Sequence, residues 1–214
     1  GDTEYTHSFP SYLTENPYGD AIDVTASVTG FEGGNYEDTA LGDAASGSFR
    51  PVGSSETVVT IKGIDTVEGS STVRFEVELS NPPKGGGCEV TIEVGNLEYT
   101  VQIGADGKGV IDVPNPNGED GYRDASDLGA DLVTVNGGGY ANVTAGANTP
   151  AHIADTVDTT EANIGLAQNG NDLLVTITLE NTPDAGHPAT VTYVVDGVEY
   201  THVFQPGDTE YTHS

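Results

Sequence analysis

The first eight residues of the chain, Gly1–Ser8, return letter for letter as its last eight, Gly207–Ser214. An identity of this length within 214 residues indicates internal repetition. Repetition constrains a fold more strongly than any local pattern, because each repeat must adopt the same structure. We therefore expect the chain to be a window cut from a longer array of near-identical repeats.

Shorter motifs recur at a spacing of roughly 100 to 105 residues, which is the size of an immunoglobulin-like domain. The matching pairs are Phe75–Pro83 with Val175–Pro183, Glu98–Thr100 with Glu199–Thr201, Gly121–Asp127 with Pro17–Asp23, and Gly138–Tyr140 with Gly34–Tyr36. This spacing predicts one complete repeat at residues 56–158. Residues 1–55 then form the C-terminal half of a repeat, and residues 159–214 form the N-terminal half of the next.

Neither half is expected to bury a sandwich core alone, and open strand edges seek partners. We favour pairing of the complementary halves between neighbouring chains, end to end, by strand exchange. Two alternatives stay open: the halves pair within one chain, or the chain is part of a continuous natural filament.

Alternating apolar residues predict strands with one buried face. Val73, Phe75, Val77 and Leu79 are expected to face inward, and so are Leu173, Val175, Ile177 and Leu179 one repeat later. Val191–Tyr200 reads as a hairpin, because the pair Asp196-Gly197 favours a type I′ turn. The predicted fold is all-β, built from tandem immunoglobulin-like β-sandwich repeats of about 100 residues.

The chain is strongly acidic, with 34 Asp and Glu residues, 6 Lys and Arg residues and a formal charge of −28. Such a charge argues against binding nucleic acid or an anionic membrane, and it favours cations with hard oxygen ligands, above all Ca²⁺. No apolar run reaches membrane-spanning length, so direct membrane insertion is not expected. The single cysteine, Cys88, is expected to be a small core residue rather than a nucleophile.

Catalytic motifs are absent from the sequence: there is no HExxH zinc signature, no Gly-x-Ser-x-Gly elbow and no phosphate-binding loop. We expect no catalytic residues, no organic cofactor and no enzymatic activity.

Acidic residues gather at two kinds of place, and both are candidate calcium sites. The junction after the complete repeat offers Asp155, Asp158, Glu161 and Asp172, and a domain boundary brings oxygen ligands together from two sides. An acidic loop offers Glu119, Asp120, Asp124 and Asp127, and its mirror in the first half-repeat offers Asp20 and Asp23. The alternatives are a plain polar linker and a solvated turn with Asx capping.

A set of motifs appears in a fixed order along the chain. They are Val67-Glu68-Gly69, Leu79-Ser80-Asn81-Pro82, Val113-Pro114, Tyr122-Arg123-Asp124-Ala125, Gly33-Gly34-Asn35-Tyr36 and Ala154–Thr160. In this order the chain resembles, over nearly its whole length, the tandem immunoglobulin-like extender repeats of giant bacterial RTX adhesins of the large-adhesion-protein (LapA-like) kind.

The resemblance implies a type I secreted stalk on the bacterial cell surface, with calcium rigidifying its linkers. The chain departs from the family pattern at Pro51 and Ser54, which stand where the second junction has Asp155 and Asp158. It departs again at Gln168-Asn169-Gly170, which replaces the Glu68-Gly69 opening, and at Cys88, since such stalks are usually cysteine-free.

Three functions are therefore considered. The first is a structural extender of an extracellular bacterial adhesin or surface filament, which projects an adhesive tip and is stiffened by Ca²⁺. The second is a self-assembling fibre subunit joined end to end by complementary half-domains, and the third is a carbohydrate-binding module. The expected partners are neighbouring repeats of the same protein and other copies of the chain.

Overall fold

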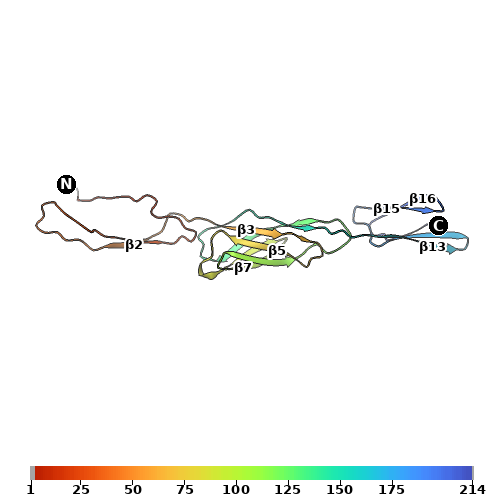
Figure 1. Cartoon of the computed structure of the whole chain (residues 1–214), viewed down its shortest axis with the longest axis horizontal. Coiled ribbons are helices and arrows are strands. Elements are labelled where there is room, and N and C mark those ends of the chain that lie inside the picture. Colours follow the sequence, from red (N-terminus) through yellow and green to blue (C-terminus); the bar gives the residue numbers. More distant parts are fainter. Residues whose placement is uncertain (1–2, 214) are drawn as a thin grey trace. The chain divides into compact units, whose positions relative to one another are not determined.

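The computed structural model describes residues 3–213, and the chain is all-β over that range, which confirms the predicted class (Figure 1). The one helical segment among these residues is a 3₁₀ turn, Lys84–Gly86. The strands are β1 (Ile22–Ala26), β2 (Ala45–Phe49), β3 (Thr57–Ile64), β4 (Thr66–Val67), β5 (Thr72–Leu79), β6 (Cys88–Val94), β7 (Leu97–Ile103), β8 (Lys108–Pro114), β9 (Ser126–Leu128), β10 (Ala130–Gly137), β11 (Val143–Ala145), β12 (Ala151–Ala154), β13 (Ala162–Asn169), β14 (Asp172–Leu179), β15 (Ala189–Val195), β16 (Val198–Phe204) and β17 (Glu210–His213).

The described residues fall into two compact units. The first holds residues up to 64 together with 73–113 and 128–151, and the second holds 65–72, 114–127 and everything from 152 on. The predicted repeat boundaries at residues 55 and 158 stay a prediction, because compactness and sequence recurrence are different criteria.

The core of the first unit lies between two sheets. One sheet has the strand order β11-β3-β5-β8 and the other has the order β10-β6-β7. Strand β5 alternates buried and exposed positions without a break, so that Val73, Phe75, Val77 and Leu79 face inward as predicted. Burying each such side chain contributes roughly 1.5–3 kcal/mol, so the alternation fixes which face of β5 is inside.

Cys88 begins β6 and is buried, in agreement with its predicted place in the core. Burial raises the pKa of its thiol. The thiolate needed for nucleophilic chemistry is therefore disfavoured at this position.

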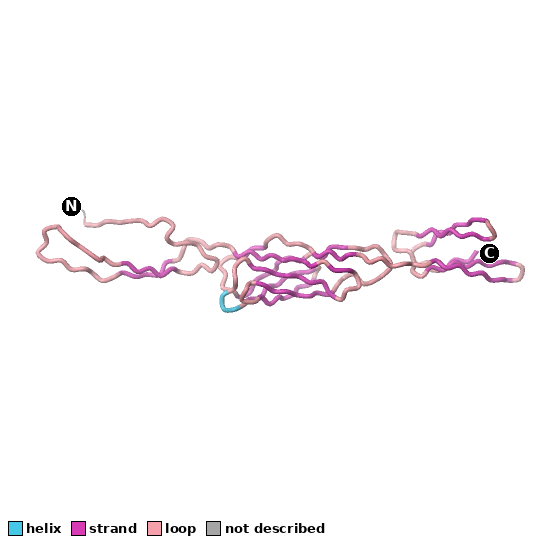
Figure 2. Tube along the Cα trace, viewed as in Figure 1, coloured by secondary structure: helices cyan, strands magenta, loops and turns pink. Residues whose placement is uncertain are grey.

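Residues 3–55 contain little regular structure (Figure 2). β1 and β2 pair antiparallel, with Ile22 opposite Phe49, and loops make up most of the rest. Residues 17–20 are tied to the sandwich of the first unit: the Tyr18 hydroxyl donates to the Pro82 carbonyl at 2.6 Å, and Lys84 forms an ion pair with Asp20.

The second unit holds three sheets with the orders β4-β12-β9, β13-β14-β17 and β15-β16. Its main apolar cluster consists of Val175, Ile177, Tyr193 and Phe204. The predicted hairpin is present as β15 and β16. Its turn residues Asp196 and Gly197 have φ values of 48° and 82°, the sign that a type I′ turn requires at both central positions.

Leu173 departs from the prediction. It was expected to face inward with Val175 and Ile177, yet its side chain is exposed. The strand pattern was correctly identified, but the described residues from 159 to 213 supply too few strands to cover this end of β14. Alternation tells which face of a strand is apolar, and a second layer is needed to bury that face.

Candidate metal centre

Glu68 lies at the centre of a cluster of carboxylates in the second unit. It directly follows β4, which pairs in parallel with β12, and its backbone N–H donates to the Ala154 carbonyl at 3.0 Å. Its side chain is only 1% exposed. A carboxylate in such a place needs hydrogen-bond donors or a cation, because burying a charge without a partner is costly.

Thr156 supplies the donors that Glu68 has. Its backbone N–H lies 2.7 Å from Glu68 Oε1, and its hydroxyl lies 2.8 Å from the same oxygen. The same hydroxyl also lies 2.7 Å from Glu119 Oε1 and 3.3 Å from Asp158 Oδ2. A hydroxyl carries one hydrogen, so the Thr156 hydroxyl can donate to only one of these three carboxylates at a time.

Two groups of three carboxylates share Glu68. One consists of Glu68, Glu119 and Asp158, and the other of Glu68, Asp124 and Asp155. Within each group the oxygens lie within 4.8 Å of one another, and either group could hold a metal ion. The second oxygen of Glu68, Oε2, is buried and has no hydrogen-bond partner. An orphaned carboxylate oxygen among other carboxylates is the donor set that a hard cation such as Ca²⁺ takes.

The pKa values of the cluster reflect this crowding. The hydrogen bonds from the backbone and hydroxyl of Thr156 lower the pKa of Glu68. The pKa of Asp124 is raised, first by desolvation, then by the charge of Asp120, by its direct interaction with Glu68 and by the charge of Asp155.

The pKa of Glu119 is also raised. The Thr156 hydroxyl acts to lower it, but interaction with Asp158, desolvation and the charge of Glu68 together outweigh that bond. The carboxylates at the edge of the cluster therefore hold their protons more tightly than usual, as expected where negative charges meet without a cation.

Gly69 permits the close approach of Glu119. It adopts φ = +70°, a conformation that L-residues with a side chain rarely take. A Cβ atom built at this position would lie 2.4 Å from Glu119 Oε2, which is closer than any allowed contact. The Glu-Gly pair thus places the buried carboxylate and leaves room for a second one beside it.

The structure brings together four of the ten predicted metal ligands. Glu119, Asp124, Asp155 and Asp158 lie in the two groups around Glu68. The other six lie in neither group: Asp120 accepts the Tyr122 N–H at 2.8 Å, Asp127 pairs with His152, Asp20 pairs with Lys84, Asp23 accepts the Ser48 hydroxyl, Glu161 stands beside β13, and Asp172 opens β14 opposite Asn169. For these six a role in metal binding stays a prediction.

Glu68 and Thr156 are the site residues that the sequence did not single out as ligands. Glu68 was noted only as part of the Val67-Glu68-Gly69 opening of a repeat, and nothing in one sequence marks a glutamate as buried. The signal that could have found it is the pair Glu68-Gly69. A glycine directly after an acid allows another segment of the chain to approach that acid closely.

A contrasting arrangement occurs in the first unit, where residues 15–54 repeat the acidic pattern. By the repeat alignment, Glu15 and Asp20 correspond to Glu119 and Asp124, whereas Pro51 and Ser54 correspond to Asp155 and Asp158. Here Lys84 supplies a positive charge directly to Asp20, and its ammonium also lies 4.3 Å from the centre of the Tyr18 ring. The residue corresponding to Lys84 one repeat later is Asp184, which cannot play this part.

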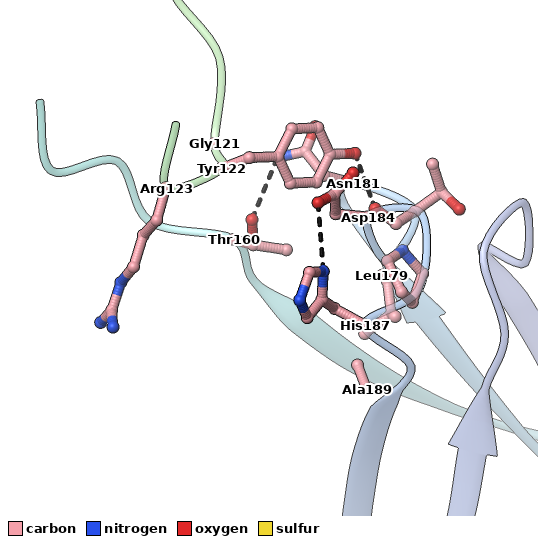
Figure 3. A pocket seen from close by; sticks show the side chains of 11 residues that line it. Gly121, Tyr122, Arg123, Thr160, Leu179, Asn181, Asp184, His187 and Ala189 are labelled. Carbon is pink, nitrogen blue, oxygen red and sulfur yellow. Dashed lines mark hydrogen bonds and ion pairs between the residues drawn. The ribbon is translucent and has the colours of Figure 1, made fainter. Parts of the chain in front are cut away.

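A hollow in the second unit is lined by Gly121, Tyr122 and Arg123 of the acidic loop and by residues that follow β14 (Figure 3). The Tyr122 hydroxyl donates to the Thr182 carbonyl at 2.7 Å, and Asn181 donates to the Thr160 hydroxyl at 3.1 Å. The Tyr122 contact repeats the contact of Tyr18 with Pro82 in the first unit. The Tyr122 bond holds the acidic loop against the loop after β14, and the Asn181 bond holds that loop against the segment before β13. The hollow therefore lies where these three segments meet.

No helix among the described residues is long and apolar enough to cross a membrane. No protein-family model matches the chain. No curated protein matches its sequence.

Among solved structures, the chain is similar to one described as "Ca2+-stabilized adhesin helps an Antarctic bacterium reach out and bind ice". The identity is 17% and the TM-score is 0.27, with 90% of this chain and 48% of that one covered. The chain thus spans about half the length of that adhesin chain. A TM-score this low does not establish a common fold.

Proposed function

We propose that the chain is a structural extender of an extracellular bacterial adhesin or surface filament, and that Ca²⁺ bound around Glu68 stiffens it. The observation that carries the proposal is the buried Glu68 Oε2, which has no hydrogen-bond partner and belongs to a carboxylate shared by two acidic groups. A repeating all-β chain with a formal charge of −28 is suited to spanning distance in an aqueous medium.

The ligands come from three separate stretches of the second unit. Glu68 follows β4, Glu119 and Asp124 lie in the acidic loop, and Asp155 and Asp158 lie in the segment that leads into the following half-repeat. A cation bound to all three would link the end of one repeat to the beginning of the next. It would also replace mutual repulsion among the carboxylates by attraction.

Calcium suits these ligands better than magnesium or zinc. The donors are carboxylate oxygens from turns and loops, and Ca²⁺ accepts six to eight oxygen ligands in variable geometry. Mg²⁺ demands near-ideal octahedral geometry and sheds water reluctantly, whereas structural zinc prefers cysteine and histidine. Calcium is abundant outside cells, which is consistent with an extracellular location.

The test is a thermal melt of the chain with calcium and with EDTA. If calcium binds only the folded state, a free concentration one hundred times the Kd stabilises it by about 2.7 kcal/mol. That corresponds to a rise in Tm of roughly 5 to 10 °C for a chain of this size. The variants E68Q and E119Q should lose most of the rise. E15Q, at the matching position of the first half-repeat, should retain it.

Small-angle scattering in the same two conditions tests the mechanical part of the proposal. Calcium should narrow the distribution of distances within the chain, and EDTA should broaden it. An identical Tm and an identical distribution in calcium and in EDTA would overturn the proposed role of the metal.

A further inference from the structure

Glu68 belongs to both groups of carboxylates in the candidate metal centre. Within each group the oxygens lie within 4.8 Å of one another. Calcium binds oxygen at about 2.3–2.6 Å, so two ligands of one ion lie at most roughly 5 Å apart. Each group therefore matches, as it stands, the space around one calcium ion.

A single ion does not reach all five carboxylates in this arrangement. Among the described residues, the five do not form one set of oxygens within that distance, but two sets of three with only Glu68 in common. An ion bound to Glu119 and Asp158 thus leaves Asp124 and Asp155 without a cation. An ion bound to the second pair leaves the first pair uncompensated in the same way.

Hydrogen bonds fix the backbone around the cluster. The Asn117 carbonyl accepts the N–H of Gly69, the residue after Glu68, at 3.2 Å. The Asn117 side chain donates to the Asp124 carbonyl at 3.1 Å and to the Ser126 hydroxyl at 3.0 Å. These bonds hold the acidic loop against the residues that flank Glu68, so the loop is not free to bring both groups to one ion.

The two oxygens of Glu68 have different surroundings. The Thr156 hydroxyl lies within 3.3 Å of every carboxylate in the group of Glu68, Glu119 and Asp158, and on Glu68 it contacts Oε1. Glu68 Oε2 is buried and has no hydrogen-bond partner. A carboxylate has lone pairs on both oxygens, so each oxygen can bind a separate cation. Glu68 is therefore able to bridge two ions.

The negative charge of the cluster also favours two ions. Five ionised carboxylates carry five negative charges, of which one Ca²⁺ neutralises two and a pair of ions neutralises four. With a single ion, the empty group keeps its repulsion between oxygens that lie within 4.8 Å of one another. Repulsion at such distances is costly in the reduced dielectric near a protein surface.

We propose that the centre binds two calcium ions that share Glu68. One ion is held by Glu68, Glu119 and Asp158, and the other by Glu68, Asp124 and Asp155. This inference rests on the proposed function, because it specifies how many ions the same centre takes. Three carboxylates offer at most six oxygens, so backbone carbonyls and water complete the coordination of each ion.

Two ions restrain the chain more than one does. Each group draws its members from the same three stretches of the second unit: the residue after β4, the acidic loop and the segment after β12. One ion is a single point of attachment, about which the stretches can rotate. A second ion close to the first removes that rotation, so both are needed to fix the orientation of the three stretches.

Equilibrium dialysis of the full chain counts the bound ions at a calcium concentration that saturates the wild type. E68Q should bind two fewer calcium ions than the wild type, whereas D124N and D158N should each bind one fewer. The double variant D124N/D158N should match E68Q, and it retains the buried glutamate if E68Q fails to fold. D127N is the matched control, because Asp127 pairs with His152 and lies in neither group.

The outcomes separate this inference from the proposed function. A loss of one ion in E68Q, in each single variant and in the double variant would overturn the shared pair and leave one calcium ion around Glu68. An unchanged number of ions in E68Q and in the double variant would overturn both proposals. A loss in D127N equal to that in D124N would overturn the assignment of the two groups. Circular dichroism in calcium verifies that each variant is folded.

Discussion

At the scale of single residues, the arrangement around Glu68 depends on the single hydrogen of the Thr156 hydroxyl and on the absence of a side chain at Gly69. The Thr156 hydroxyl lies near three carboxylates but can donate to only one, and Gly69 leaves the space in which Glu119 approaches Glu68. Both features leave negative charge uncompensated by the protein. A cation is the simplest means of compensating it.

We expect G69A to weaken calcium binding as well as folding. The positive φ at this position costs an alanine about 1–2 kcal/mol, and the added Cβ displaces Glu119. G95A is the matched control, because Gly95 also has a positive φ of 63° but nothing within 4 Å of the added atom. Isothermal titration should show weaker calcium binding for G69A alone. Equal calcium affinities in the two variants would exclude a role for Gly69 in the site.

The response of stability to pH has opposite signs for different members of the cluster. Glu119 and Asp124 have pKa values raised above their ordinary 4.5 and 3.8, so without metal they stabilise the fold most when protonated, and they lose this contribution as the pH rises. Glu68 has a lowered pKa, so its contribution is present above 4.5 and is lost as the pH falls.

Calcium requires all these carboxylates in their ionised form. We expect the rise in Tm on adding calcium to be full at pH 7 and to shrink on acidification, starting above pH 4.5, as Glu119 and Asp124 take up protons. Melts with calcium and with EDTA from pH 7 down to pH 4 measure this. A difference in Tm that stays constant over the whole range would mean that these two residues do not bind the ion.

At the scale of the strand, the contribution of an apolar side chain to stability depends more on whether other strands cover it than on which residue it is. Ile61 and Ile164 are the same residue at the same register of β3 and β13, yet one is buried and the other exposed. We expect I61A to lower the free energy of unfolding by about 2–5 kcal/mol, as for large-to-small changes in a packed core.

I164A should cost less than about 1 kcal/mol at concentrations where the chain is monomeric, because its methyl groups already contact water. Urea denaturation at low protein concentration measures both values. A large loss for I164A would contradict the exposed position of Ile164 in β13.

The sequence predicts a structural feature well when the feature is local, and poorly when it depends on residues far away in the chain. The alternation in β5 and the Asp196-Gly197 turn predict strand, face and hairpin correctly, because both are local properties. The exposure of Leu173 and the burial of Glu68 could not be predicted in this way. The first depends on a strand that is missing from the sheet, and the second on Thr156, which lies 88 residues along the chain.

At the scale of the whole molecule, the two acidic loops are held in different ways. In the first unit Lys84 pairs with Asp20. In the second unit Asp124 lies among other carboxylates, and Asp184 stands at the position that corresponds to Lys84. One loop thus has its positive charge built into the chain, and by our proposal the other takes it from solution.

We expect EDTA to loosen one loop and not the other. Amide hydrogen exchange should accelerate over residues 119–128 when calcium is removed, because local opening becomes easier without the ion. Exchange over residues 17–26 should be unaffected by EDTA but accelerate in K84A. If EDTA accelerates hydrogen exchange equally in both loops, then it is wrong that a lysine stabilises one loop and a metal ion stabilises the other.

The hydrogen bonds between Glu68 and Thr156 join two residues that lie 88 positions apart in the chain. The strands between them must be in place before the carboxylates can gather, so by our proposal the ion is captured late in folding. Calcium would then slow unfolding and leave the folding rate nearly unchanged.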